Sequence, residues 1–342
     1  MTRDHIVPFP PCAAPSDGVA HRVSAPRSAG CGPASRRRPV PLDDLIVAQG
    51  GLVTRAQAVR LGLSCDAIDR RLAVRRWVPT HPRVYRDARW PLTEASRMRA
   101  AVLWAGAGAV LSGAAAAWWW GLLEVAPVTV VVTVPRRRAP RSRPGVQVRR
   151  RDADPADVTE HAGVAVAIPA AAVLQAVQEP GIAGEELLTG MLCGAADGPA
   201  PGLDALLLAQ ARTGGAHGSA RTGRLLATAV HRAVGHGRHR LRELLVRHRV
   251  PGWRTDHVIA GVVLPVAFPR ERVAVEIRGG GSGPDACGAA WRRAVLRRHG
   301  WHTVTLDPSD PIRRPVATVQ AIGAALAGRP QDPGGASARA SS

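Results

Sequence analysis

Residues 42–85 limit the possible folds of this chain more than any other part, because three short helical patterns and a hairpin pattern follow one another there without room for anything else. The first helix is indicated by apolar residues at helical spacing and by a glycine pair that ends it: Leu42, Leu45, Ile46, Gly50 and Gly51. Thr54 and Ser64 are the expected N-caps of two further helices, the second of which runs to Arg76. A hairpin is expected from the residues on either side of a Thr-His-Pro-Arg turn: Trp77, Val78, Val84 and Tyr85.

Two helices joined by a turn of about three or four residues that contains glycine are typical of a helix-turn-helix, whose second helix normally lies in the major groove of DNA. The same pattern fits a small three-helix interaction module with a solvated arginine face. On the DNA-binding interpretation, the helix from Ser64 to Arg76 contacts bases or phosphates and the hairpin forms a wing. The DNA-binding residues predicted in this segment are Thr54, Arg55, Ser64, Arg70, Arg71, Arg75, Arg76 and Arg83.

The segment LDDLIVAQGGLVTRAQAVRLGLSCDAIDRRLAVRRW, followed by HPRVY, resembles the N-terminal winged-helix domain of AbiEi-type antitoxins from type IV toxin–antitoxin systems. The resemblance is close over residues 42–85 and looser to residue 180, and the string LSGAAAAWWWGLL also resembles the segment that follows the winged helix in that family. It implies a DNA-binding regulator and a nucleotidyltransferase-like toxin as partner. Arg75 and Arg83 stand where the family has glycine, and arginine costs about 1 kcal/mol there if the backbone needs a positive φ.

The net charge of +20 comes from arginine alone, since the chain contains no lysine. Such a balance favours a polyanionic partner, here double-stranded DNA. The chain also lacks asparagine, which indicates coding bias in a GC-rich genome, so the clustering of arginines is more informative than their number. The densest cluster, residues 135–151, holds eight arginines and no acid. We expect it on a hairpin between two strands, where Arg136, Arg137 and Arg138 contact phosphates; the alternative is a solvated turn.

The five cysteines, at positions 12, 31, 65, 193 and 287, contain no C-x-x-C pair. This argues against a disulfide scaffold or a zinc site and favours a reducing, cytoplasmic location. Residues 101–123 are uncharged, but Ser112 and Gly113 divide them into two helices that are each too short to span a membrane. We therefore expect no membrane association.

The C-terminal part predicts the order helix, strand, strand, strand, helix, strand. It resembles an endonuclease domain of the PD-(D/E)xK class related to very-short-patch repair nucleases, through VAVEIRGGG and RRAVLRRHGWHTVTL. Of the acids that hold Mg²⁺ in that family, the chain keeps Glu276; Pro265 and Arg278 replace two, and Arg238 or His239 stands near the place of a third. Asp256 is the nearby substitute. We expect a vestigial, pseudoenzyme site without metal, in which Arg278 attracts phosphate.

The predicted organisation is an α+β protein with the following parts: 1–40, a disordered tail; 41–90, a winged helix-turn-helix; 91–178, an antitoxin-like α/β region; 179–230, a helical linker; 231–327, an endonuclease-like domain; 328–342, a disordered tail. The predicted function is DNA binding for transcription regulation, with no cofactor. One alternative is a metal-dependent DNA endonuclease that uses Mg²⁺. Another is a protein-interaction module that neutralises a toxin through the triple tryptophan, residues 118–120.

Overall fold

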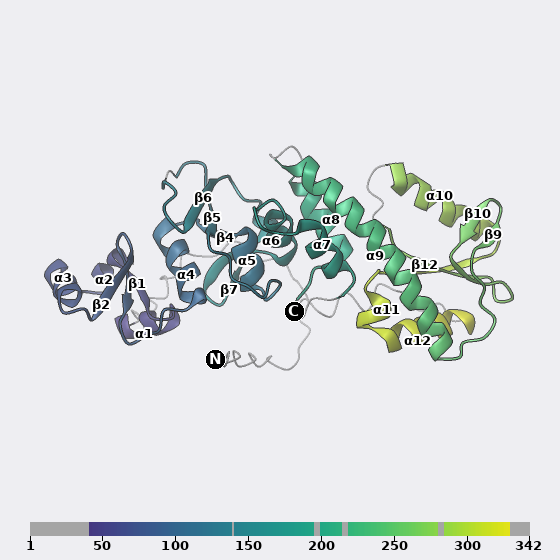
Figure 1. The fold of residues 1–342 in the computed structure, drawn as a ribbon, viewed down its shortest axis with the longest axis horizontal. Coiled ribbons are helices and arrows are strands. Elements are labelled where there is room, and N and C mark those ends of the chain that lie inside the picture. The colour runs from purple at the N-terminus through teal and green to yellow at the C-terminus, as the bar shows by residue number, and fades with distance from the viewer. Residues whose placement is uncertain (1–40, 139, 195–198, 214–217, 280–283, 329–342) are drawn as a thin grey trace, which may run out of the picture. The chain divides into compact units, whose positions relative to one another are not determined.

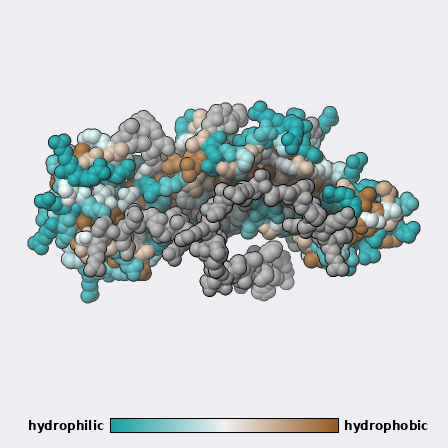
Figure 2. Space-filling view, turned by 180° about the vertical axis from the view of Figure 1, so that it is seen from behind, coloured by the Kyte–Doolittle hydropathy of each residue, from teal (hydrophilic) through white to brown (hydrophobic). Residues whose placement is uncertain are grey.

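The computed structural model describes residues 41–138, 140–194, 199–213, 218–279 and 284–328. The predicted disordered tails, 1–40 and 328–342, lie outside these residues except for Gly328. The described chain is of mixed α and β type, in agreement with the predicted class (Figure 1). Figure 2 shows one face of it, on which hydrophobic residues lie in smaller areas between hydrophilic ones.

The N-terminal elements are three helices and an antiparallel sheet of order β1-β3-β2. In chain order they are α1 (Leu42–Ala48), β1 (Leu52–Thr54), α2 (Arg55–Arg60), α3 (Cys65–Ala73), β2 (Trp77–His81) and β3 (Val84–Asp87). The predicted helices and hairpin are confirmed. The strand β1 was missed, because three residues are too few to show an alternating pattern. The core that holds these elements together consists of Ile46, Val53, Ala58, Ile68, Trp77 and Tyr85.

A five-stranded sheet of order β6-β5-β4-β8-β7 follows. This region contains α4 (Glu94–Ala105), β4 (Val110–Ser112), α5 (Gly113–Trp119), β5 (Val130–Val134), β6 (Val146–Arg150), β7 (Val158–His161), β8 (Val164–Ala167) and α6 (Pro169–Ala176). The prediction of a hairpin across residues 135–151 is wrong, because β5 and β6 are parallel and pair Val130 with Val146 and Val134 with Arg150. Proline and glycine predict a loop, but they do not determine whether the two strands that it joins are parallel or antiparallel. Here the chain returns to the level of the start of β5 before β6 begins, so the two strands are parallel.

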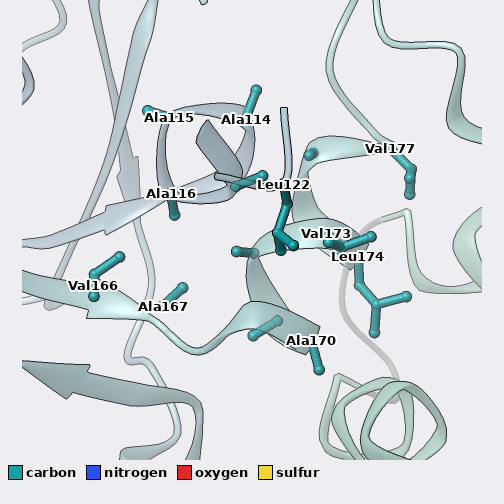
Figure 3. Close-up of a cluster of buried hydrophobic side chains, with 14 of the residues drawn as sticks. Ala114, Ala115, Ala116, Leu122, Val166, Ala167, Ala170, Val173, Leu174 and Val177 are labelled. Carbon is teal, nitrogen blue, oxygen red and sulfur yellow. The ribbon is translucent and has the colours of Figure 1, made fainter. Parts of the chain in front are cut away.

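The helices α5 and α6 pack closely against each other, because their facing side chains are small. Residues 114–117 of α5 and 170–172 of α6 are alanines buried in the largest core cluster. Figure 3 shows residues from both helices with Leu122 and with Val166 and Ala167 of β8. The uncharged stretch 101–123 is divided among α4, β4 and α5, and no helix in the described ranges is long and apolar enough to cross a membrane.

Three further helices are α7 (Gly184–Leu192), α8 (Leu203–Arg212) and α9 (Ser219–Arg247). The predicted boundary between residues 230 and 231 falls inside α9, which continues through it without a break (Figure 1). The helix α9 begins at Ser219, within the predicted helical linker. The first half of α9 contributes Leu226 and Ala229 to the largest core cluster, and the second half contributes Leu241 and Leu245 to a separate one.

The C-terminal elements are β9 (His257–Ile259), β10 (Val262–Leu264), β11 (Val266–Phe268), β12 (Val273–Ile277), α10 (Pro284–Arg298), β13 (His302–Leu306), α11 (Asp310–Arg313) and α12 (Pro315–Leu326). Four strands precede α10, where three were predicted, because residues 257–268 fold into three short strands. The sheet order is β11-β12-β13, and α10 connects the parallel strands β12 and β13. This connection places α10 next to the end of β12, where Glu276 lies.

Candidate nucleic-acid interface

The helix α3, predicted to contact DNA, is fixed in place by a buried face and by a cap. Ile68 is completely buried, and the Ser64 hydroxyl accepts a hydrogen bond from the Ala67 amide at 3.1 Å. The helix ends at Ala73, earlier than predicted, because Arg75 has a φ of 54°, which lies outside the α region. Arg75 and Arg76 therefore lie between α3 and β2 and not on the helix.

Thr54 caps α2, and Arg55 connects α2 to α3. The Thr54 hydroxyl accepts a hydrogen bond from the Gln57 amide at 3.1 Å, and the Gln57 side chain accepts one from the Thr54 amide at 2.8 Å. The Arg55 guanidinium donates to both carboxylate oxygens of Asp69 at 2.8 and 3.3 Å, which lowers the pKa of Asp69. Both Arg55 and Asp69 reach solvent, so a phosphate that binds Arg55 must compete with Asp69.

Arg70 and Arg71, although adjacent in sequence, have different surroundings. The Arg71 guanidinium donates to the Ala67 carbonyl at 3.0 Å and lies 5.5 Å from the centre of the Trp77 ring. Arg71 is therefore part of the packing between α3 and β2. Arg70 is exposed and makes no side-chain hydrogen bond or ion pair with any residue in the described ranges, so its charge is available to a ligand.

The hairpin separates the remaining predicted contacts into two groups. Arg83 lies at the turn between β2 and β3, with a φ of 63°, and its carbonyl accepts a hydrogen bond from the Arg55 amide at 2.8 Å. The turn is thereby attached to the start of α2. Arg75 and Arg76 lie at the opposite end of the hairpin, where Trp77 pairs with Asp87. The structure thus brings Arg83 close to Thr54 and Arg55 but not to Arg75.

The arginines that follow β5 and those that end β6 lie at the same end of the five-stranded sheet, because these two strands are parallel. The Arg151 amide donates to the Val134 carbonyl at 2.9 Å. The Arg136 amide donates to Asp152 at 3.1 Å, and the Arg136 guanidinium lies 3.9 Å from the Asp152 carboxylate. The Arg138 guanidinium donates to the Ala105 carbonyl at 3.2 Å. Arg137 is exposed and has no hydrogen-bonding or ionic partner among the described residues. Of the three arginines predicted to contact phosphate, Arg137 is the one whose guanidinium the fold leaves free.

Glu276, the acid kept from the nuclease pattern, lies in a cavity that is rich in arginine. The Arg292 guanidinium on α10 donates to the Glu276 carboxylate at 2.9 Å. Arg278 forms an ion pair with Asp204 of α8, and Pro265 lines the same cavity. No group of three or more histidine, cysteine, aspartate or glutamate side chains that could hold a metal exists in the ranges that the structure describes. These residues do not fit Mg²⁺, which needs oxygen ligands where the chain has guanidinium groups.

The triple tryptophan, considered as a docking surface, is partly buried against the largest core. The indole N–H of Trp120 donates to the Ala167 carbonyl at 2.8 Å, and its ring lies 4.3 Å from that of His161. The Arg99 guanidinium lies 5.7 Å from the centre of the Trp119 ring. These contacts give the tryptophans a role in the fold itself.

No protein-family model matches this sequence, and no curated protein matches it significantly. The catalytic domain of the homing endonuclease I-Bth0305I is similar to 27% of this chain and 94% of its own, with 15% identity and a TM-score of 0.24. The RV2827C protein from Mycobacterium tuberculosis is similar to 58% of this chain and 80% of its own, with 19% identity and a TM-score of 0.37. TM-scores this low establish no common fold.

Sequence reasoning missed three charged residues of the arginine-rich cavity: Arg292, Arg293 and Asp204. Arg292 belongs to the arginine-rich string that ends the chain's nuclease-like pattern, and its place on a helix after the Glu276 strand was a usable signal. Asp204 lies 74 residues before its partner Arg278, so no local pattern indicates the ion pair.

Proposed function

We propose that residues 41–90 form a winged helix-turn-helix that binds double-stranded DNA, and that the chain is an antitoxin-like transcription regulator. The observation that supports this best is the position of Arg70 on α3. The opposite side of α3 is held by Ile68 and by the Ser64 cap, so Arg70 projects from a rigid support with its charge unpaired among the described residues. A helix fixed in this way can present a guanidinium to the major groove at little cost in conformational entropy.

We further propose that residues 231–327 are a nuclease-like domain without a working metal site. The Glu276–Arg292 ion pair supports this, because the carboxylate that would bind Mg²⁺ already accepts a hydrogen bond from a cation. The metal-dependent endonuclease remains the competing function. Incubating plasmid DNA with Mg²⁺ or Mn²⁺ tests it: cleavage by the wild type that Glu276→Ala abolishes would contradict our proposal.

The DNA-binding proposal is tested with fluorescence anisotropy on the duplex upstream of the chain's own coding sequence and on a duplex of scrambled sequence. Arg70→Gln should weaken binding to the preferred duplex by about tenfold and reduce the difference between the two duplexes, since an arginine bound to a base edge contributes to discrimination. Arg137→Gln should weaken binding to both duplexes equally and lower the salt dependence by about one phosphate contact.

Arg137 is the better choice for this test than the full triplet, because the guanidinium of Arg136 forms an ion pair with Asp152 and that of Arg138 donates to the Ala105 carbonyl. Arg247→Gln, which removes an exposed arginine at the end of α9, is the matched control for loss of one charge. Wild-type protein that ignores both duplexes at low ionic strength would contradict the proposal, and so would equal effects of Arg70→Gln and Arg247→Gln.

A further inference from the structure

A cavity of about 500 Å³ lies beside Glu276 and is lined by residues from α8, α9, β12 and α10. Its charged lining residues are Asp204, Arg238, Glu276, Arg278, Arg292 and Arg293. Four arginines thus face two acids. Both acids already have partners, since Glu276 is paired with Arg292 and Asp204 with Arg278.

The cavity therefore contains positive charge that the described protein residues do not neutralise. Arg238 and Arg293 form no ion pair within the described ranges. The Nε–H groups of Arg238 and Arg292 are buried and lack an acceptor there. Burial lowers the pKa of Arg238, and the neighbouring Arg292 and Arg242 lower it further, although Glu276 and Asp256 partly oppose the fall. The guanidinium groups of Arg238 and Arg293 line the cavity without an ionic partner among the described residues, so the cavity favours a ligand that supplies negatively charged oxygen atoms.

We propose that this cavity binds a phosphate group, held by Arg238, Arg292 and Arg293 without a metal ion. Arginine is suited to this role because its planar guanidinium donates two parallel hydrogen bonds to phosphate oxygens. The position that a nuclease would use for metal ligands is thus converted from attracting cations to attracting anions. The phosphate belongs to a nucleic-acid strand or to a free nucleotide, since a cavity of this volume accommodates more than the phosphate alone. The inference is independent of DNA binding by α3.

The proposal is tested on the full-length protein by calorimetric titration with inorganic pyrophosphate. Arg238→Gln and Arg293→Gln should each weaken pyrophosphate binding by about tenfold, as expected for the loss of a charged hydrogen-bond donor. Arg297→Gln is the matched control, because Arg297 lies one turn further along α10, is exposed and does not line the cavity. Wild-type protein that binds no pyrophosphate would overturn the proposal, as would equal losses in Arg293→Gln and Arg297→Gln.

Two further probes distinguish the sources of the phosphate. A short single-stranded oligonucleotide with a 5′-phosphate should bind more tightly than adenosine 5′-monophosphate if the cavity takes a strand, and no more tightly if it takes a free nucleotide. Adenosine, which lacks the phosphate of adenosine 5′-monophosphate, should show no effect of Arg238→Gln on its binding. If that effect persists without the phosphate, the cavity recognises something else and the proposal is wrong.

A measurement on the wild-type protein avoids any dependence on the folding of variants. Phenylglyoxal modifies accessible arginines, and peptide mass spectrometry reports the rate at each position. Pyrophosphate should slow modification of Arg238, Arg292 and Arg293 but not of Arg297. Equal rates with and without pyrophosphate at the three cavity arginines would overturn the proposal.

Discussion

Arg75 and Arg83 are the clearest case in which a single residue conflicts with its backbone conformation. The resemblance to AbiEi-type antitoxins placed arginine where that family has glycine, and the structure confirms a positive φ at both positions, 54° and 63°. A side chain in this region costs about 1 kcal/mol relative to glycine. At both positions the fold requires a left-handed backbone conformation, which is unfavourable for arginine because of its Cβ atom.

We predict that Arg75→Gly raises the free energy of unfolding by up to about 1 kcal/mol. Glycine removes the steric cost in the folded state, but it also increases the conformational entropy of the unfolded chain, which offsets part of the gain. Arg76→Gly is the matched control: it removes the same charge from the next residue, which has no positive φ, and should lower the free energy of unfolding. Urea denaturation measures both. A loss of stability in Arg75→Gly equal to that in Arg76→Gly would show that the φ of Arg75 stores no strain.

At the scale of elements, α9 provides a sharp comparison between two glycines two residues apart. A Cβ at Gly235 would meet no atom within 4 Å, whereas a Cβ at Gly237 would lie 2.9 Å from the Pro308 carbonyl oxygen and 3.3 Å from Ile277. Gly237 therefore allows the second half of α9 to approach the sheet and α11 closely. Helical periodicity predicts the helix but gives no indication of which glycine is needed.

We predict that Gly235→Ala raises the free energy of unfolding by about 0.5–1 kcal/mol through helix propensity alone. Gly237→Ala should lower it by about 1 kcal/mol or more, since the propensity gain is outweighed by a clash with backbone. Thermal unfolding followed by circular dichroism measures both. Stabilisation by Gly237→Ala would mean that α9 and the Pro308 segment are further apart than the structure has them.

At the scale of the whole molecule, stability depends on Glu179, which joins three segments far apart in sequence. Its carboxylate accepts a hydrogen bond from the Ala114 amide of α5 at 3.2 Å and lies 3.5 Å from the Arg149 guanidinium of β6. Burial raises the pKa of Glu179 to about 6 from its ordinary 4.5, although Arg149 and the Ala114 amide oppose the rise. The folded chain therefore holds this proton more tightly than the unfolded chain.

It follows that the contribution of Glu179 to stability is complete below about pH 4.5 and is lost as the pH rises through 6. We predict that the free energy of unfolding of the wild type relative to Glu179→Gln falls by roughly 2 kcal/mol in total between a pH well below 4.5 and a pH well above 6. Urea denaturation at several pH values measures the difference. Glu186→Gln, at an exposed position, should reproduce the wild-type profile; a flat difference between wild type and Glu179→Gln would refute the prediction.

The sequence by itself determined those features that depend on neighbouring residues. The periodic apolar residues, the caps Thr54 and Ser64 and the glycine breaks specify the helices of residues 42–85, because hydrogen bonding in a helix and its caps is local. The β-branched residues of 130–134 favour a strand, β5, because that preference also depends on local sequence. The sequence placed Arg70 and Arg137 among the predicted contacts, but it did not distinguish either of them from the neighbouring arginines.

Tertiary structure decided the direction of strand pairing and the partner of each charge. The parallel pairing of β5 with β6 and the Arg278–Asp204 ion pair join residues that no local pattern relates. The arginine-rich cavity depends on the same long-range packing, since α8, α9 and α10 each contribute to it. Contacts between residues far apart in sequence depend on how well the surfaces of whole helices and sheets fit together. A local sequence pattern does not contain that information.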